Sequence, residues 1–337
     1  MLATQDHTAM LGVSITFLLL DILVVGIRFY RVRMQKSPYE IDDWLVLPAL
    51  ALNIGMSIAV WFGVARHAVG YPTPPLTQAP VTVRTPLDQV NATISTNNEV
   101  FFIVSSMFAA SVSLSKASIL CFYRRIFCLR GLWRDLTMIS ITFMLVIVAM
   151  FGIGITFAFI FACGTHFEYY WSTAGAELLE KCINTQKLVY AQSVSDFIID
   201  AIIILMPIAM VWKLHMKVQR KLAVIAIFLT ASLAVIASLI KLVWFLWENE
   251  TPWNPANDQD LIDSTFIFWS ILETHVGLLA VCLPTLRLKL NNNWSLGLIM
   301  SNVRSMMSLS SLRTTKGKDG RSSTSESRGG SDDLSRV

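Results

Sequence analysis

Six ionisable side chains lie inside long apolar stretches of this 337-residue chain, and they are the residues best placed to do chemistry. They are Asp21, Lys116, Asp196, Asp200, Lys241 and Glu273. A charge at the centre of a membrane-spanning helix costs about 2.5–3.5 kcal/mol on insertion scales, so each is expected to face the bundle interior and find a partner. Four acids against two lysines leave two acids without a cation. Such a polar cluster could fix helix register, bind a ligand, relay protons or supply a catalytic acid.

The depth of each charge follows from a rise of about 1.5 Å per residue along a helix. Asp21, Asp200 and Glu273 come out at roughly 18–20 Å below the outer surface, near the midplane. Asp196 comes out at about 12 Å, Lys241 at about 9 Å, and the remaining lysine deeper, at about 24 Å. The depths predict that Asp196 meets Lys241 on the outer side, while the deeper lysine reaches toward the midplane carboxylates.

The histidines and the last apolar stretch indicate that the chain uses no cofactor. His275 is two residues from Glu273 and therefore on another helical face, and no other histidine is spaced to complete a metal site. A retinal protein needs a Schiff-base lysine in its last span, and residues 261–286 contain none. We therefore expect neither metal nor retinal, and we assign no catalytic residue.

The elements that must position these charges are membrane-spanning helices. Hydrophobic residues make up 54% of the chain and charged residues 15%, against about 25% charged in soluble proteins. This composition excludes a cytosolic enzyme, a disordered protein and a disulfide-dense secreted module. About 20 mostly apolar residues cross the hydrocarbon core. Seven segments meet that requirement: 8–30, 43–66, 98–123, 136–163, 187–212, 221–247 and 261–286. The predicted fold is an all-α, seven-transmembrane helix bundle over residues 1–290.

Lysine and arginine predict how the bundle is oriented. Basic residues concentrate in the connections after spans one, three and five, for example at 28–36, 124–134 and 213–221, and they are sparse in the alternate connections. The positive-inside rule then places the N-terminus outside and the C-terminus in the cytosol. The net charge of +4 conceals this polarity and gives no reason to expect nucleic acid as a partner. The expected surroundings are the lipid bilayer.

Several features of the loops and the tail carry further predictions. Asn91-Ala92-Thr93 is a glycosylation sequon on the outer side, unless it is a chance triplet. Cys163 and Cys182 flank the second outer loop, and bridging them would stabilise the fold by roughly 3 kcal/mol; the alternative is two free thiols. Residues 291–311 have the spacing of a short interfacial amphipathic helix, and 312–337 form a disordered Ser/Gly/basic tail.

Several motifs occur in a fixed order along the chain. They are Arg28-Phe29-Tyr30-Arg31, Asp42-Asp43-Trp44, the stretch from Leu114 to Phe127, the set Cys163, Trp171, Cys182 and Asn184, the set Asp196, Asp200, Leu205 and Pro207, and the set Trp269, Glu273, Gly277 and Cys282 to Arg287. With these motifs the chain resembles, over about residues 12–290, the fungal rhodopsin-like domain proteins. These are seven-span proteins related to satratoxin-cluster membrane proteins and to the membrane domain of appressorium surface-sensing receptors. Lys241 departs from the family pattern, which usually has arginine there.

The resemblance implies a receptor-like protein, often encoded near genes for secondary-metabolite synthesis. We expect a multi-pass protein of the plasma membrane or an endomembrane that senses or handles a small apolar metabolite near Asp200 and Glu273. A cytosolic signalling partner would dock on the basic loops. The alternative is an integral membrane cyclase or isomerase that uses a buried carboxylate as general acid, so whether the chain is an enzyme stays open. A transporter is a third alternative, weakened because the sequence shows no internal repeat.

Overall fold

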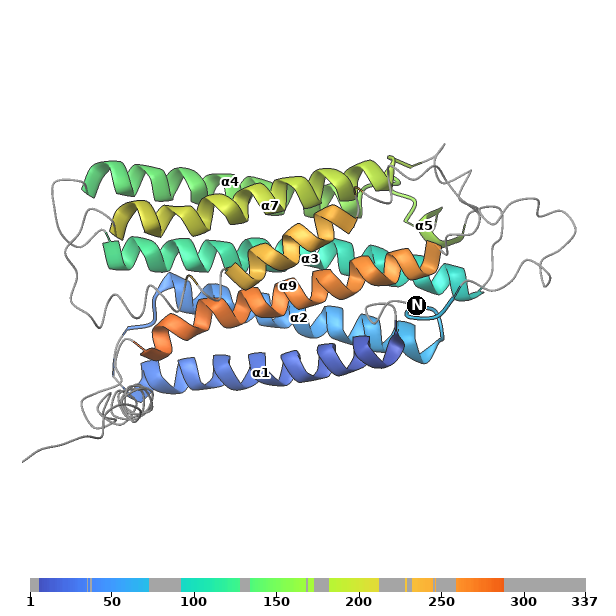
Figure 1. The fold of residues 1–337 in the computed structure, drawn as a ribbon, viewed down its shortest axis with the longest axis horizontal. Coiled ribbons are helices and arrows are strands. Elements are labelled where there is room, and N and C mark those ends of the chain that lie inside the picture. Colours follow the sequence, from blue (N-terminus) through green and yellow to red (C-terminus); the bar gives the residue numbers. More distant parts are fainter. Residues whose placement is uncertain are drawn as a thin grey trace, which may run out of the picture. The chain divides into compact units, whose positions relative to one another are not determined.

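Every regular element in the described part of the chain is a helix. The computed structural model describes residues 6–34, 36, 38–72, 92–127, 134–167, 169–172, 182–211, 228, 232–244, 246 and 259–287. The helices are α1 (His7–Met34), α2 (Ile41–Ala65), α3 (Ala92–Phe127), α4 (Arg134–Ile160), α5 (Tyr169–Ser172), α7 (Thr185–Val211) and α9 (Gln259–Arg287), labelled in Figure 1. A further helix covers Ser232–Trp244, and we refer to it as the 232–244 helix.

Six of these helices, all but α5 and the 232–244 helix, are long and apolar enough to cross a membrane. Each overlaps one of the predicted spans. The remaining predicted span, 221–247, is described over Ser232–Trp244, where it forms a shorter apolar helix. The all-helical, multi-pass membrane fold predicted from the sequence is therefore confirmed. The predicted glycosylation site Asn91, the interfacial helix at 291–311 and the tail at 312–337 lie outside the described residues.

Helix α3 occupies the centre of the bundle. It packs against α2, α4, α5, α7 and α9, and Figure 1 shows it between α2 and α4. Within the most apolar 18 residues of each span, 67% of those in α3 and 61% of those in α9 are buried, against 22% in α4 and 28% in α1. The two most buried helices, α3 and α9, are also two of those that carry intramembrane charges.

The outer faces of α1 and α4 expose large apolar side chains. Leu19 and Leu23 on α1, and Phe143 and Met150 on α4, are all more than half exposed. In water such a surface would drive aggregation, whereas in a bilayer these side chains contact lipid tails. The burial pattern therefore agrees with the hydropathy of the sequence.

Small residues allow α3 and α4 to approach closely. A Cβ atom added at Gly152 of α4 would lie 2.5 Å from both Cβ and Oγ of Ser113 on α3. The Ser113 hydroxyl donates to the carbonyl of Ala109 at 2.7 Å, so the polar group is satisfied within its own helix. Glycine and serine at helix contacts are typical of membrane proteins, where close packing stabilises the bundle.

The segment that follows α2 contacts both α1 and α9. Gly70 has φ of +78°, and its backbone N–H donates to the hydroxyl of Ser264 on α9 at 2.9 Å. A Cβ atom at Gly70 would lie 2.8 Å from Cα of His7 on α1. Both the left-handed backbone conformation and the close contact therefore require glycine here.

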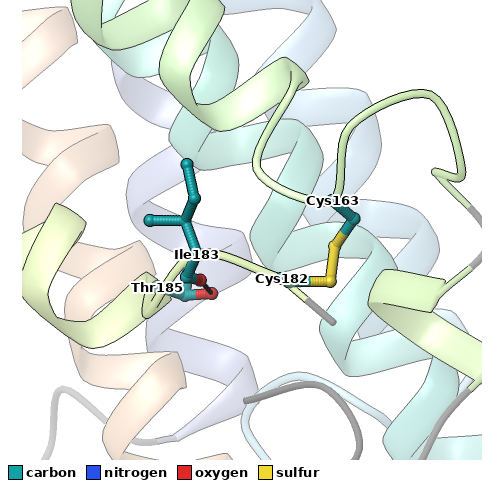
Figure 2. The surroundings of a disulfide bond; sticks show 4 residues. All are labelled: Cys163, Cys182, Ile183 and Thr185. Carbon is teal, nitrogen blue, oxygen red and sulfur yellow. Dashed lines mark hydrogen bonds between the residues drawn. A yellow bond between two sulfur atoms is a disulfide. The ribbon is translucent and has the colours of Figure 1, made fainter. Parts of the chain in front are cut away.

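A disulfide links the end of α4 to the start of α7. Figure 2 shows Cys163, just after α4, bonded to Cys182, just before α7, with Cα atoms 4.2 Å apart. Next to the bridge, the backbone N–H of Ile183 donates to the carbonyl of Ala162 at 2.8 Å. At the start of α7, the hydroxyl of Thr185 donates a hydrogen bond to the carbonyl of Ile183 at 3.4 Å. The bridge and the hydrogen bonds hold α4 and α7 together at this end of the bundle.

Candidate functional site

Four helices contribute to one buried group of charges, which we call the charged cluster. Its members are Lys116 of α3, Asp196 and Asp200 of α7, Lys241 of the 232–244 helix, and Glu273 of α9. None of the five is more than 8% exposed. Five of the six intramembrane charges singled out from the sequence thus meet in one place.

Lys116 lies between the two aspartates of α7. Its Nζ atom is 2.6 Å from Oδ1 of Asp196, 3.2 Å from the backbone carbonyl oxygen of Asp196 and 2.9 Å from Oδ1 of Asp200. An ammonium group has three N–H donors. These three acceptors therefore occupy every donor of Lys116.

Lys241 pairs with the acid on α9 and also reaches α7. Its Nζ atom is 2.8 Å from Oε2 of Glu273 and 3.5 Å from Oδ2 of Asp196. The same ammonium lies 3.9 Å from the centre of the Phe108 ring, within cation–π range. Asp196 is consequently the acid that connects the two lysines.

The pairing expected from helix depth is only part of the arrangement. The structure does bring Asp196 to Lys241, but Asp196 is closer to Lys116, and Lys241 is closer to Glu273. Depth estimates treat each charge as a point on a straight helix perpendicular to the membrane. Lysine side chains are long and flexible, and spans are commonly tilted, so charges at different nominal depths can meet.

Asp21 belongs to a second buried group and not to the charged cluster, which corrects the expectation from the sequence. Its Oδ2 atom lies 2.7 Å from Nδ1 of His275 on α9, and it accepts a hydrogen bond from the amide of Asn53 on α2 at 3.1 Å. The Ser57 hydroxyl is 3.5 Å from Nε2 of His275. Because His275 and Glu273 point to different faces of α9, this helix serves both groups. The charged cluster therefore holds three acids and two lysines.

A third buried ionic group was missed by reasoning from the sequence. Arg28 of α1 is 1% exposed and donates to Asp42 and Asp43 at the start of α2, both at 2.8 Å, and to the carbonyl of Val281 on α9 at 3.0 Å. By its position in the sequence, Arg28 belongs with the basic residues of the first connection. The available signal was a pair of acids at the first turn of an apolar helix, where the helix dipole favours negative charge.

A cavity of about 40 Å³ adjoins the charged cluster. Its polar lining residues are Lys116, Asp200, Glu273 and Thr274, and its other lining residues are Val112, Ile119, Ile203, Ala234, Val235, Gly277 and Ala280. Within the described part of the chain, Oδ2 of Asp200 has no hydrogen-bond partner, whereas the carboxyl group of Glu273 is hydrogen-bonded to that of Asp196. A single water needs at least about 10–15 Å³ of such volume, so the cavity has room for a few waters or a small polar group.

The three acids are close enough together to bind a metal ion, but the two lysines beside them make binding of a divalent cation unfavourable. Carboxylate oxygens of Asp196, Asp200 and Glu273 lie within 4.8 Å of one another. Two ammonium groups already contact these oxygens. With three negative and two positive charges, one proton or one monovalent cation would balance the cluster, whereas a divalent cation would leave an excess positive charge in the membrane.

Comparison with known proteins gives one family and two relatives. The model of the fungal rhodopsin domain matches residues 27–292. The chain is 27% identical over 288 residues to the "Polyenoic acids biosynthesis gene cluster protein Ba17b" of Metarhizium anisopliae. The aligned region covers 80% of this chain and 70% of that protein. The chain is 26% identical over 180 residues to a "SAT4 family membrane protein" of Emericella nidulans. This second aligned region covers 53% of this chain and 42% of that protein. No solved structure matches the chain.

Proposed function

The chain belongs to the fungal rhodopsin domain family, and from this premise we propose that it is a receptor-like membrane protein that binds a small metabolite without using retinal. The observation that carries the proposal is the cavity beside the charged cluster, which is lined by Asp200, a residue whose Oδ2 atom has no hydrogen-bond partner among the described residues. A buried polar group without a partner costs free energy, so it is a natural place for a ligand to bind.

The position of the cavity supports a receptor-like role. Its lining comes from α3, α7, the 232–244 helix and α9, and ion pairs across the same helices hold them together. A ligand that competes for Asp200 or Glu273 would change the relative stability of helix arrangements, which is how binding energy becomes a signal. The basic connections at 124–134 and 213–221 are the surfaces that we propose for a cytosolic signalling partner.

One relative supports a role in secondary metabolism. The protein of Metarhizium anisopliae is named for a polyenoic acids biosynthesis gene cluster. We propose that the present chain is likewise an accessory component of a biosynthetic pathway, which senses or assists in handling a pathway metabolite.

Metabolite profiling tests the proposal directly. A deletion strain would be complemented with the wild type, Asp200→Asn or Glu273→Gln, with Asp21→Asn as the matched buried acid outside the cluster. The proposal expects altered amounts of pathway products, without build-up of one intermediate, in the first two variants and near wild-type profiles with Asp21→Asn. Equal profiles in all strains at equal protein levels would contradict it.

An enzyme is the second candidate, and the three-to-two balance of the charged cluster favours it. Because the cluster has one more acid than it has lysines, one of its carboxyl groups could carry a proton and act as general acid in a cyclisation or isomerisation. In the same experiment an enzyme would give accumulation of one defined precursor in the Glu273→Gln strain. Neutralising the basic connections separates the candidates further, because a signalling protein needs them and an enzyme does not. Correct insertion of those variants must be checked, since the same residues set the topology.

A further inference from the structure

We propose that the ligand of the cavity carries a protonated amine on a small apolar body. This inference rests on the proposed function, because it assigns a chemical class to the ligand of the same cavity. It goes further by excluding carboxylates and by ranking amines above alcohols.

The donors around the cavity are already used. The three N–H donors of Lys116 go to Asp196 and Asp200. The hydroxyl of Thr274 donates to the backbone carbonyl of Ile271 at 2.9 Å. No donor of these two residues is left for a ligand.

The acceptors around the cavity are not used up. Oδ2 of Asp200 has no hydrogen-bond partner within the described part of the chain, and this residue is 8% exposed. The hydroxyl oxygen of Thr274 can also accept. A ligand that meets this lining must therefore supply hydrogen-bond donors.

The net charge of the charged cluster favours one class of hydrogen-bond donor on the ligand over another. Three carboxylates and two ammonium groups leave the cluster one negative charge in excess when all are ionised. A protonated amine supplies donors and can also replace the proton that otherwise balances this charge, whereas an alcohol supplies a donor only. A carboxylate would add a fourth negative charge to a buried site and would find no free donor on Lys116 or Thr274, which is unfavourable on both counts.

The remaining lining residues of the cavity indicate the polarity and size of the rest of the ligand. Seven of the lining residues are aliphatic or glycine, and three of these, Ala234, Gly277 and Ala280, have a small side chain or none. A Cβ atom added at Gly277 would meet nothing within 4 Å. A short apolar chain fits this environment, and the cavity volume of about 40 Å³ argues against a large one.

Three four-carbon probes test the proposal on the purified full-length protein in detergent. They are n-butylamine, butan-1-ol and butyrate, which share a tail and differ in charge and hydrogen bonding. We expect n-butylamine to raise the thermal unfolding midpoint by about 2–4 °C at saturation, butan-1-ol to raise it less, and butyrate to give no rise. A rise with butyrate that equals or exceeds the rise with the amine would overturn the proposal, as would no rise with the amine.

Variants separate cavity binding from effects on the detergent. Glu273→Gln and Asp200→Asn should lower the apparent affinity for n-butylamine at least tenfold, while Asp21→Asn should leave it unchanged. Gly277→Leu keeps every charge and fills the cavity, so it should also abolish the rise, and it serves where the charge variants fail to fold. An unchanged rise in Gly277→Leu would place the amine elsewhere and contradict the proposal.

The two proposals can fail separately. If n-butylamine does not bind but the Asp200→Asn and Glu273→Gln strains have altered metabolite profiles, the ligand class is wrong and the proposed function stands. If the amine binds as described but the strains are unchanged, the cavity is an amine site and the proposed metabolic role is wrong.

Discussion

At the scale of single residues, Asp196 is the centre of the charged cluster. It contacts Lys116 at 2.6 Å and Lys241 at 3.5 Å, and it is fully buried. Glu273 and Asp200 each contact one lysine and line the cavity. The cluster thus combines an acid that contacts both lysines with two acids that line the cavity.

This arrangement predicts which charge swap can be tolerated. Lys241→Glu and Glu273→Lys each leave like charges facing one another in a buried site, so each should destabilise the fold by about 3–5 kcal/mol. The double variant restores one opposite pair at the same place and should recover most of the loss. Yield of monodisperse protein and the unfolding midpoint in detergent measure the effect.

The control is the swap that helix depth alone favours. Asp196→Lys combined with Lys241→Asp should recover little, because the new lysine would face Lys116 at the position of a 2.6 Å ion pair. If this double variant recovers as well as the Lys241–Glu273 swap, then Lys116 does not pair with Asp196.

At this scale, the burial of the site residues can be predicted from the sequence, whereas their pairing cannot. That an ionisable residue in an apolar span must be buried and paired follows from its cost in the membrane, so the five residues of the cluster could be predicted. Which residues pair depends on tilt, rotation and side-chain reach, so helix depth alone groups Asp21 with the wrong partners. Its actual partner, His275, lies two positions from Glu273, and helical spacing alone gives no reason to connect it with α1.

At the scale of helices, the contact between α3 and α4 depends on the absence of a side chain at Gly152. An alanine there would gain about 1 kcal/mol in helix propensity. Its Cβ atom would, however, lie 2.5 Å from the side chain of Ser113, and overpacking of this kind costs about 1–3 kcal/mol.

We predict that Gly152→Ala lowers the unfolding midpoint and that Ser113→Gly restores part of it in the double variant, because it removes both contacting atoms. The matched control is Gly154→Ala, two residues along the same helix, where an added Cβ atom meets nothing within 4 Å. That control should be neutral or stabilising. Thermal unfolding in detergent distinguishes the three variants, and a Gly152→Ala protein as stable as Gly154→Ala would contradict the close contact.

The disulfide acts on the same scale, because it fixes the end of α4 to the start of α7. The bridge closes a loop with a sequence separation of 19 residues, so its loss should cost roughly 3 kcal/mol. Cys163→Ser, Cys182→Ser and the double variant should all show the same lower unfolding midpoint, and reductant should lower the midpoint of the wild type but not that of these three variants. The matched control is Cys121→Ser, which removes a free thiol within α3 and should keep the response to reductant. Unequal single variants would indicate that one cysteine has another partner.

At the scale of the whole molecule, the existence of the helices could be predicted and their packing could not. Length and hydropathy suffice to identify a span, since the backbone must satisfy its hydrogen bonds within the membrane. Helices α3 and α9 are the most buried, yet their described spans are less apolar than that of α4, because their interior faces carry serines and charges. Polarity inside a span thus indicates a central position, but the identity of the neighbours depends on contacts such as Gly152 to Ser113.

The distribution of charge across the bundle predicts its orientation. Helices α1 and α3 both end in basic residues, Arg31 and Arg33 on one and Arg124 and Arg125 on the other. These ends should lie in the cytosol, with the N-terminus outside. In that orientation the sequon at Asn91 would face the glycosylation machinery, whereas a second sequon, Asn293-Trp294-Ser295, would lie on the cytosolic side. We predict that Asn91→Gln removes an endoglycosidase-sensitive shift on gels, that Asn293→Gln leaves it unchanged, and that protease digests a C-terminal epitope in sealed microsomes. A shift that depends on Asn293, or an epitope protected until the vesicles are opened, would invert the orientation and would put the proposed signalling surfaces on the wrong side of the membrane.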